Sequence, residues 1–340
     1  MAIVRYRLSV WRYIQQFRTS QTPPLQTEME SVVDKRQPID GPAAVIMTVM
    51  CAIWGLQQVA IKVAAPDIAP ILQIALRSGI AAVLVGLILI LRRNKMTLNI
   101  DTWRGGLLVG TLFALEYVAV GEGLRYTSAA HMVIFLYTAP IFAAIGLHVR
   151  FPSERLTAVQ WGGILLAFAG VIVAFFAPGE TTASMADQRI GDALGLLGAA
   201  AWGATTVTIR CSRLAEAPAP LTLFYQLAGA FVILAALAWA TGQTRVQFSA
   251  ITVASLAFQT VVFSFLSLLV WFWMLGRYLG SRLGVLSFMT PLFGVVFGVW
   301  LLDETLQSSF IVGSLLVLIG IVVVSGHDLF KLRMARLVKD

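Results

Sequence analysis

Long apolar stretches, each about the length that crosses a bilayer, dominate the chain from residue 43 onward. A membrane-spanning helix needs about 20 consecutive apolar residues. Ten segments meet this requirement, at residues 43–63, 70–91, 105–124, 128–149, 158–177, 192–212, 219–241, 250–274, 281–302 and 308–326. The linkers between them are short, so consecutive helices are expected to run antiparallel. The pattern predicts an all-α polytopic membrane protein with ten transmembrane helices.

The composition agrees with lipid rather than water as the surrounding medium. The 340 residues are 58% hydrophobic and 12% charged, with a mean hydropathy of +0.82. A soluble domain carries about 25% charged residues. Cys51 and Cys211 form no C-x-x-C spacing, and the three histidines do not share a helix face, so we expect neither a disulfide framework nor a metal site. We predict no cofactor.

The basic residues predict the orientation. The chain has 25 Lys and Arg against 17 Asp and Glu, a net charge of +8. In membrane proteins such residues gather in cytoplasmic loops. With the N-terminus inside, twenty fall on the cytoplasmic side and four outside, namely Lys62, Arg125, Arg189 and Arg245. We therefore predict a multi-pass plasma-membrane protein (inner membrane in a bacterium) with both termini cytoplasmic and no nucleic-acid partner.

The second half of the chain repeats the first. Matching residues recur in the same order at offsets of 148 to 152 positions. The matched pairs are Trp54 and Trp202, Lys62 and Arg210, Pro70 and Pro218, Gly79 and Gly229, Arg125 and Arg277, Pro140 and Pro291, Glu154 and Glu304, Gly163 and Gly313, and Gly170 and Gly320. Because five helices is an odd number, the second copy is inverted relative to the first, as in many secondary transporters.

These repeats divide the chain into five parts. They are a cytoplasmic N-terminal tail (1–42), a first five-helix repeat (43–177), an extracytoplasmic linker (178–191), a second five-helix repeat (192–326) and a basic cytoplasmic C-terminal tail (327–340). Val4, Leu8, Trp11 and Ile14 are spaced for one face of a basic amphipathic helix on the membrane surface. A disordered tail, or a dispensable extension before Met29, is the alternative.

The repeated residues resemble the EamA family of the drug/metabolite transporter superfamily over about residues 43 to 326. The resemblance is carried by Trp54-Gly55 with Lys62 eight residues later, Pro140 in the fourth helix, and Glu154-Arg155-Leu156 after it. The second copy departs slightly, with Thr305 after Glu304 and Arg210 in place of the usual Lys. The resemblance implies a ten-helix transporter with a central cavity lined by both halves, and export as the direction; it does not name the substrate.

Two prolines lie at matching positions in apolar helices. Pro140 removes a backbone hydrogen bond to the carbonyl of Leu136, and Pro291 does so for Ser287. Interruptions at corresponding positions in two halves point to a transport site. We therefore predict a hinge at each proline, although membrane helices also tolerate prolines that merely bend them.

Polar side chains inside the apolar segments are candidates for a substrate cavity, because a polar stripe facing lipid is costly. Trp54, Gln58 and Lys62 share one helix face, and Trp202, Thr206 and Arg210 form the equivalent face. Lys62 and Arg210 are alternatively helix ends that reach the interface. The remaining cavity candidates are Tyr117, Tyr137, Tyr225, Gln226 and Gln259; His131 is a weaker one that more simply lies at the interface.

Glu116 and Arg77 are the ionisable residues placed deepest in the apolar segments. A carboxylate at the depth of Glu116 has a functional role by default, here as a proton carrier. Counting about 1.5 Å per residue puts Arg77 at a similar depth, so a buried structural pair is the alternative.

The leading hypothesis is a secondary transporter, not an enzyme, that exports a small metabolite, amino acid or drug by alternating access with possible proton coupling. We expect a small-molecule substrate, contact with the lipid bilayer, and a monomer or homodimer. No G-x-x-x-x-G-K-[ST] loop for nucleotide binding occurs. The alternatives are a facilitative channel or uniporter without coupling, and an intramembrane enzyme acting on lipid, for which no catalytic motif is found.

Overall fold

The computed structural model describes residues 40–91, 100–152, 155–175, 185–278, 283 and 286–337. The surface helix expected near the N-terminus, Glu154 and the first half of the linker 178–191 lie outside this set. Asp40, the first described residue, accepts a hydrogen bond from the backbone N–H of Ala43 (2.8 Å) and so caps the first described helix.

The described chain is helical and has no β-strand, only an isolated bridge between Ile68 and Val246. The helices are α3 (Gly41–Ala64), α4 (Pro70–Leu91), α5 (Ile100–Gly123), α6 (Ala129–Leu136), α7 (Ala139–Arg150), α8 (Ala158–Phe175), α9 (Met185–Arg210), η2 (Arg213–Ala215), α10 (Ala219–Ala240), α11 (Ala250–Ala257), η3 (Phe258–Ser267), α12 (Leu268–Arg277), α14 (Met289–Leu302) and α15 (Ser308–Leu337).

Seven helical stretches among the described residues are long and apolar enough to cross a membrane. Three further apolar helices are shorter, at residues 158–174, 289–302 and 308–323. These three fall within the expected fifth, ninth and tenth segments. Seven of the ten predicted spans are therefore matched by full-length candidates among the described residues, and in the ninth segment a turn at Phe288 precedes α14.

Several helix bounds differ from the sequence prediction. Helix α9 starts at Met185, inside the stretch 178–191 that we predicted as a linker. Helix α15 continues to Leu337, through much of the predicted tail 327–340. The eighth segment changes to a π-helix between Phe258 and Ser267. Hydropathy marks the part of a helix that is apolar, and a helix continues past it wherever polar residues still favour helical geometry.

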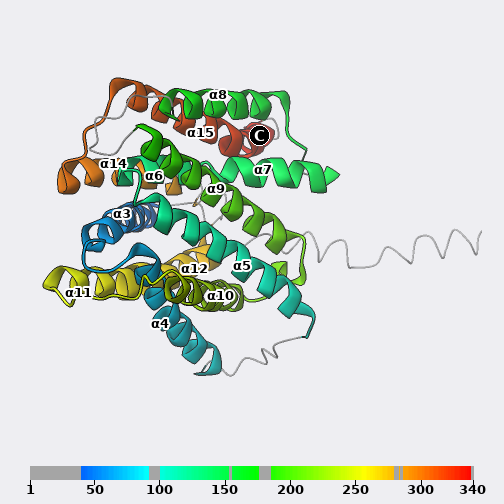
Figure 1. The fold of residues 1–340 in the computed structure, drawn as a ribbon. Helices are drawn as coiled ribbons and strands as arrows, with labels where there is room; N and C mark the ends of the chain where they lie inside the picture. Colours follow the sequence, from blue (N-terminus) through cyan, green and yellow to red (C-terminus); the bar gives the residue numbers. More distant parts are fainter. Residues whose placement is uncertain are drawn as a thin grey trace, which may run out of the picture.

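The helices pack through small residues across the two halves of the sequence. Helices α8 and α15 lie side by side at the top of Figure 1, and α4 packs against α10 and α5 against α9. A Cβ added at Gly170 would lie 2.6 Å from the carbonyl oxygen of Gly313, and one added at Gly229 would lie 2.6 Å from the Cα of Gly110. Glycines therefore let the backbones of α8 and α15, and of α5 and α10, approach closely.

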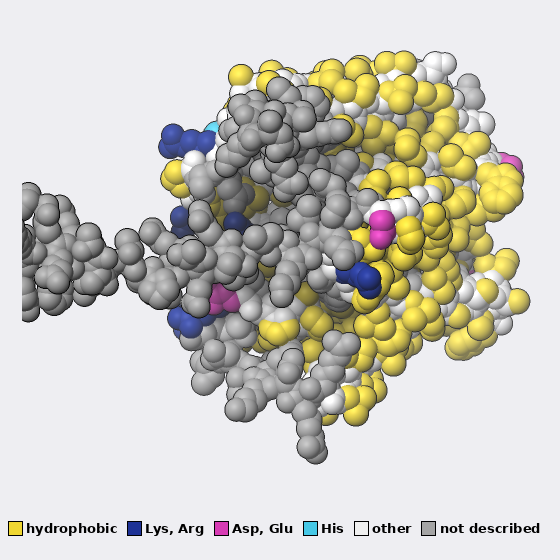
Figure 2. Space-filling model, turned by 180° about the vertical axis from the view of Figure 1, so that it is seen from behind, with side chains coloured by type: hydrophobic (Ala, Val, Ile, Leu, Met, Phe, Trp, Pro, Cys, Tyr) yellow, Lys and Arg dark blue, Asp and Glu magenta, His cyan; other side chains and the backbone are white. Residues whose placement is uncertain are grey.

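The outer surface is apolar over much of the molecule. Hydrophobic side chains form a broad, nearly continuous cover on the described face in Figure 2. Leu91, Val149 and Trp300 are 79%, 79% and 72% exposed. So large an apolar surface would be unfavourable in water, whereas in a bilayer it needs no cover.

Candidate functional site

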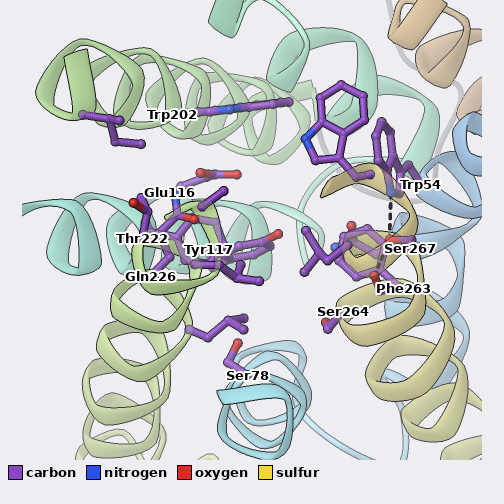
Figure 3. Close-up of a pocket in the computed structure, with 18 of the residues that line it drawn as sticks. Trp54, Ser78, Glu116, Tyr117, Trp202, Thr222, Gln226, Phe263, Ser264 and Ser267 are labelled. Carbon is purple, nitrogen blue, oxygen red and sulfur yellow. Dashed lines mark hydrogen bonds between the residues drawn. The ribbon is translucent and has the colours of Figure 1, made fainter. Parts of the chain in front are cut away.

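A cavity of about 580 Å³ lies between the helices of both halves. Residues from α3, α4, α5, α9, α10, η3 and α12 line it, so its wall joins positions more than 200 residues apart in sequence. Polar groups in the wall include Gln57, Gln58, Arg77, Ser78, Glu116, Tyr117, Tyr137, Thr222, Gln226, Ser264 and Ser267. Figure 3 shows these helices surrounding one space, with Trp54 and Trp202 at one side and Ser78 at the opposite side.

Aromatic side chains form a large part of the wall. Trp54 meets Trp271 edge to face, with ring centroids 5.5 Å apart, and Tyr137 meets Trp202 in the same manner at 5.5 Å. The indole Nε1 of Trp54 donates to Ser267 Oγ at 3.0 Å, the dashed line in Figure 3. This bond connects α3 to η3 and fixes the orientation of the Trp54 ring at the cavity.

Arg77 is buried in the wall, 1% exposed, between two aromatic rings. Its Cζ lies 4.7 Å from the ring centroid of Tyr117 and 4.8 Å from that of Phe263. With the amide of Gln57 oriented so that its oxygen faces the guanidinium, that oxygen accepts from Nη1 at 2.8 Å and Nη2 at 3.1 Å. The positive charge is thus held by one amide and two ring faces, which is a satisfied arrangement for a buried arginine.

Glu116 lies in the same wall and is 5% exposed. Its Oε2 has no hydrogen-bond partner in the structure, and the ion pairs among the described residues include none between Glu116 and Arg77. The sequence-based alternative of a direct Glu116–Arg77 pair is therefore not what the structure shows. Figure 3 shows the carboxylate below the Trp202 ring and on the same side of the cavity as Thr222 and Gln226.

Gln58 and Gln226 are the cavity amides that the sequence had singled out. Gln58, from α3, is 3% exposed, and its Oε1 has no hydrogen-bond partner. Gln226, from α10, lines the cavity one helical turn after Thr222. The sequence candidates that do line the cavity are Trp54, Gln58, Arg77, Glu116, Tyr117, Tyr137, Trp202 and Gln226.

Three predicted cavity residues lie elsewhere. Thr206 is exposed and donates to the carbonyl of Trp202 (3.2 Å). Tyr225 is next to Gln226 on α10, and successive residues of an α-helix point about 100° apart. Gln226 faces the cavity, whereas Tyr225 packs on Gly106 of α5. Gln259 is completely buried and donates to Gln73 Oε1 (2.8 Å) and Ser255 Oγ (2.9 Å), so it holds η3 to α4.

Lys62 and Glu304 meet at the end of the bundle away from Arg210, which we call the Lys62 end. Lys62 Nζ lies 3.6 Å from Glu304 Oε1 and donates to the carbonyl of Thr127 at 2.5 Å. The two oxygens of Glu304 accept from the backbone N–H groups of Ala129 (2.6 Å) and Ala130 (3.0 Å). Lys62 therefore does not face the cavity, and Glu304 caps the N-terminus of α6.

A second polar cluster lies beside this cap. The Asp192 side chain is completely buried; it accepts from Thr127 Oγ1 at 2.6 Å, and its Oδ2 lies 3.0 Å from His131 Nδ1. The His131 ring stacks on Phe310 with centroids 3.8 Å apart. His131 is thus buried in a network between α6, α9 and α15 and is not an interfacial residue.

Further contacts connect the remaining loops at the Lys62 end. Gln243 donates to Glu122 Oε1 (3.0 Å), and the backbone N–H of Gln247 donates to the carbonyl of Asp67 (2.9 Å). Ser249 also donates to the Asp67 carboxylate. Hydrogen bonds thus join the described connections α3–α4, α5–α6, α10–α11 and α14–α15 and the start of α9. None of these segments contributes a residue to the cavity wall, so the described wall is closed at this end.

The opposite end, which we call the Arg210 end, is where the cavity reaches the surface. Ile209 is in the wall although its neighbour Arg210 is not. Beyond it, the exposed residues Ala215 and Ala219 also line the cavity, in and after the loop between α9 and α10. The wall is therefore open at this loop.

The two prolines follow helix breaks at the cavity wall. Helix α6 ends at Leu136, and α7 starts at Ala139 with Pro140 in its first turn. Helix α14 starts at Met289 after a turn at Phe288, with Pro291 in its first turn. Leu136, Tyr137 and Ser287 line the cavity, so both predicted breaks border it.

Sequence reasoning missed several wall residues. They are Gln57, Ser78, Phe113, Thr222, Phe263, Ser264, Ser267 and Trp271. Hydroxyl groups at 264 and 267 in an apolar segment were a usable signal. The sequence did not show that the side chains at 264 and 267 face the same cavity. Their directions depend on the π-helix of η3, in which successive residues rotate about the helix axis by less than in an α-helix.

No group of three or more His, Cys, Asp or Glu residues suited to a metal ion occurs in the part of the chain that the structure describes.

Comparisons with known proteins find similar sequences over both halves of this chain. A model described as the EamA-like transporter family matches residues 41–176 and 189–326. A probable amino-acid metabolite efflux pump of Salmonella typhimurium is 27% identical over 83% of this chain and 93% of its own length. The corresponding protein of Escherichia coli is 26% identical over 88% and 98%, and the uncharacterized transporter YoaV of Bacillus subtilis 24% over 79% and 91%.

The fold also has a relative of known structure. A protein with a crystal structure superimposes with a TM-score of 0.58 at 20% identity, over 84% of this chain and 96% of its own. At this identity the likeness concerns the fold alone.

Proposed function

The chain belongs to the EamA-like transporter family, and on that premise we propose that it is a secondary transporter that exports a small metabolite, amino acid or drug across the plasma membrane by alternating access. The matched regions cover both halves of the chain, and the three relatives described above are named as transporters or efflux pumps. The names of the Salmonella and Escherichia relatives favour an amino-acid metabolite and export.

The observation that carries the proposal is a central cavity open at one end and closed at the other. Alternating access requires a substrate site that reaches one side of the membrane at a time. The hydrogen bonds at the Lys62 end close one side, while exposed wall residues between α9 and α10 lead to the other. A continuous channel needs no such closed end, so this asymmetry favours a carrier.

We further propose ten crossings arranged as two inverted repeats, 43–177 and 192–326. The described connections alternate between the two ends: α3–α4 and α5–α6 meet at the Lys62 end, and α9–α10 lies at the other. The charge distribution supports a cytoplasmic Arg210 end, with both termini inside. The structure then corresponds to a cytoplasm-facing state with a closed outer side.

Proton coupling requires a titratable group in the cavity. Glu116 is the carboxyl group in the described wall. In this proposal the Glu116 carboxyl group is exposed to each side of the membrane in turn, so it takes up a proton on one side and releases it on the other in each cycle. A uniporter without coupling uses the same cavity without this exchange.

Reconstitution into liposomes tests the transport proposal. We expect vesicles preloaded with an unlabelled aromatic amino acid or amine to take up the labelled form by counterflow, with a rate that saturates with concentration. Uptake that rises linearly with concentration would instead indicate a channel and overturn the proposal. An imposed pH gradient then tests coupling, because a coupled carrier accumulates substrate above equilibrium and a uniporter does not.

The helix breaks give a prediction about the two prolines. We expect Pro140→Ala and Pro291→Ala each to slow counterflow about tenfold, equivalent to about 1.4 kcal/mol on the conformational barrier. Alanine restores a backbone donor and favours a continuous helix across each break. The measurement is the counterflow rate per folded protein, with Pro70→Ala at the first residue of α4 as the control. Unchanged rates in both variants would show that the breaks are not hinges.

A further inference from the structure

The cavity wall contains two buried oxygen acceptors that no described group satisfies. Glu116 Oε2 and Gln58 Oε1 have no hydrogen-bond partner, although the two residues are 5% and 3% exposed. They come from α5 and α3 and line the same space. Leaving such acceptors without a donor costs about 1–3 kcal/mol each, and more for a charged group. A ligand that brings hydrogen-bond donors removes this cost.

The basic group in the wall is already engaged. The Arg77 guanidinium faces the Gln57 oxygen and lies between the rings of Tyr117 and Phe263. The rings of Tyr117 and Phe263 cover the guanidinium, and Arg77 is only 1% exposed. A substrate carboxylate would have to displace these partners to reach it. The charge available to a ligand is therefore the negative charge of Glu116.

The rest of the wall suits a cation attached to an apolar body. Trp54, Trp202 and Trp271 are partly exposed and line the cavity. Aromatic faces attract ammonium groups, and indole attracts them most strongly. Phe113, Leu136 and Leu227 complete an apolar lining large enough for a small ring.

We propose that the cavity binds substrates through a protonated primary amine, with the ammonium group at Glu116 and Gln58 and an apolar or aromatic body against the tryptophans. An ammonium group supplies three donors, which matches the two acceptors and leaves one for a further oxygen. The amine is the required group, and a substrate carboxylate is dispensable because Arg77 is occupied. This inference rests on the proposed transport function only for calling the ligand a substrate.

Three ligands that share a phenyl ring on a two-carbon chain separate amine from acid recognition. Phenethylamine carries the amine alone, L-phenylalanine carries both groups, and 3-phenylpropionate carries the acid alone. Binding is measured with purified protein in detergent by the ligand-dependent change in total tryptophan fluorescence, to which the three cavity tryptophans contribute. We expect saturable binding of phenethylamine at least as tight as that of phenylalanine, and binding of 3-phenylpropionate at least tenfold weaker.

Variants then locate the amine. Glu116→Gln is expected to weaken both amines at least tenfold, whereas Asp303→Asn is the control. Asp303 is an exposed carboxylate outside the cavity, at the end of α14. Gln58→Leu should weaken the amines several-fold as a second, uncharged change. If Glu116→Gln does not fold, the three-ligand series on the unaltered protein still decides the proposal.

The outcomes distinguish this inference from the transport proposal. Absence of saturable phenethylamine binding, or equal binding of 3-phenylpropionate, overturns amine recognition. Binding of amines without any saturable counterflow would overturn the transporter but support the amine site. Saturable counterflow of 3-phenylpropionate that Glu116→Gln leaves unchanged would support the transporter and overturn the amine site.

Discussion

Glu304→Gln is expected to lower the free energy of unfolding by about 1.5–3 kcal/mol, the range for losing hydrogen bonds to a charged group. The carboxylate of Glu304 accepts from the N–H groups of Ala129 and Ala130 and neutralises Lys62. An amide has one acceptor oxygen, so its NH₂ group would face a backbone donor. The charge that favours the helix N-terminus is lost as well.

This arrangement has no easy substitute. Ser128 already accepts from the N–H of His131 (3.0 Å), so the first turn of α6 uses Ser128 for one donor and Glu304 for two others. A Cβ added at Gly298 would lie 2.5 Å from Glu304 Oε2, which shows how closely the carboxylate is enclosed. Because Ser128 is already used and Gly298 lies against the carboxylate, another acceptor could reach the N–H groups of Ala129 and Ala130 only if the backbone shifted.

Titration with SDS in detergent micelles measures this effect. The matched control is Asp303→Asn, because Asp303 is exposed and its left-handed backbone (φ 52°) is a conformation that Asn also adopts readily. The control should change stability by less than about 0.5 kcal/mol. Equal stability of Glu304→Gln and the unaltered protein would mean that the Glu304 cap at α6 contributes nothing to the free energy of unfolding.

Arg77 and Gln57 are expected to show strong coupling in a double-mutant cycle. Gln57→Leu removes the oxygen that accepts from the guanidinium and leaves a buried charge with only aromatic partners. Breaking a buried interaction of a charge by removing one partner costs up to about 3–5 kcal/mol. Arg77→Met removes the charge but leaves the Gln57 oxygen without its donor and loses both ring contacts.

The double variant Arg77→Met with Gln57→Leu should be destabilised by less than the sum of the single variants, with a coupling of about 1–3 kcal/mol. Replacing both partners with apolar groups avoids stranding either one. Ser78→Ala in the unaltered protein, next to Arg77 in the cavity wall, serves as a comparison of small effect. Additive effects of Arg77→Met and Gln57→Leu would contradict the geometry described for this pair.

Sequence reasoning placed some parts of the site well for physical reasons. Polar residues are costly in apolar helices, so Gln58, Glu116 and Gln226 were identified as inward-facing, and the structure places all three on the cavity. The two prolines likewise marked interruptions that border it. The predictions for Tyr225 and Gln259 differ from the structure, because one side chain packs between helices and the other holds η3 to α4.

The role of Lys62 shows why the rest required coordinates. From sequence, Lys62 could reach the interface or face inward. Its partner Glu304 is 242 positions away, and the helix start that both stabilise is at Ala129. Periodicity describes which residues share a face of one helix, but it says nothing about which other helix that face meets.

The sequence by itself determined the helical membrane class, the approximate helix bounds and the residues too polar for lipid, because these depend on the local cost of placing each segment in a bilayer. Only the tertiary structure decided which of those residues share a cavity, which end of it is closed, and that Arg77 is engaged while Glu116 Oε2 has no hydrogen-bond partner. Those properties depend on the rotation of each helix about its axis and on distances between segments remote in sequence.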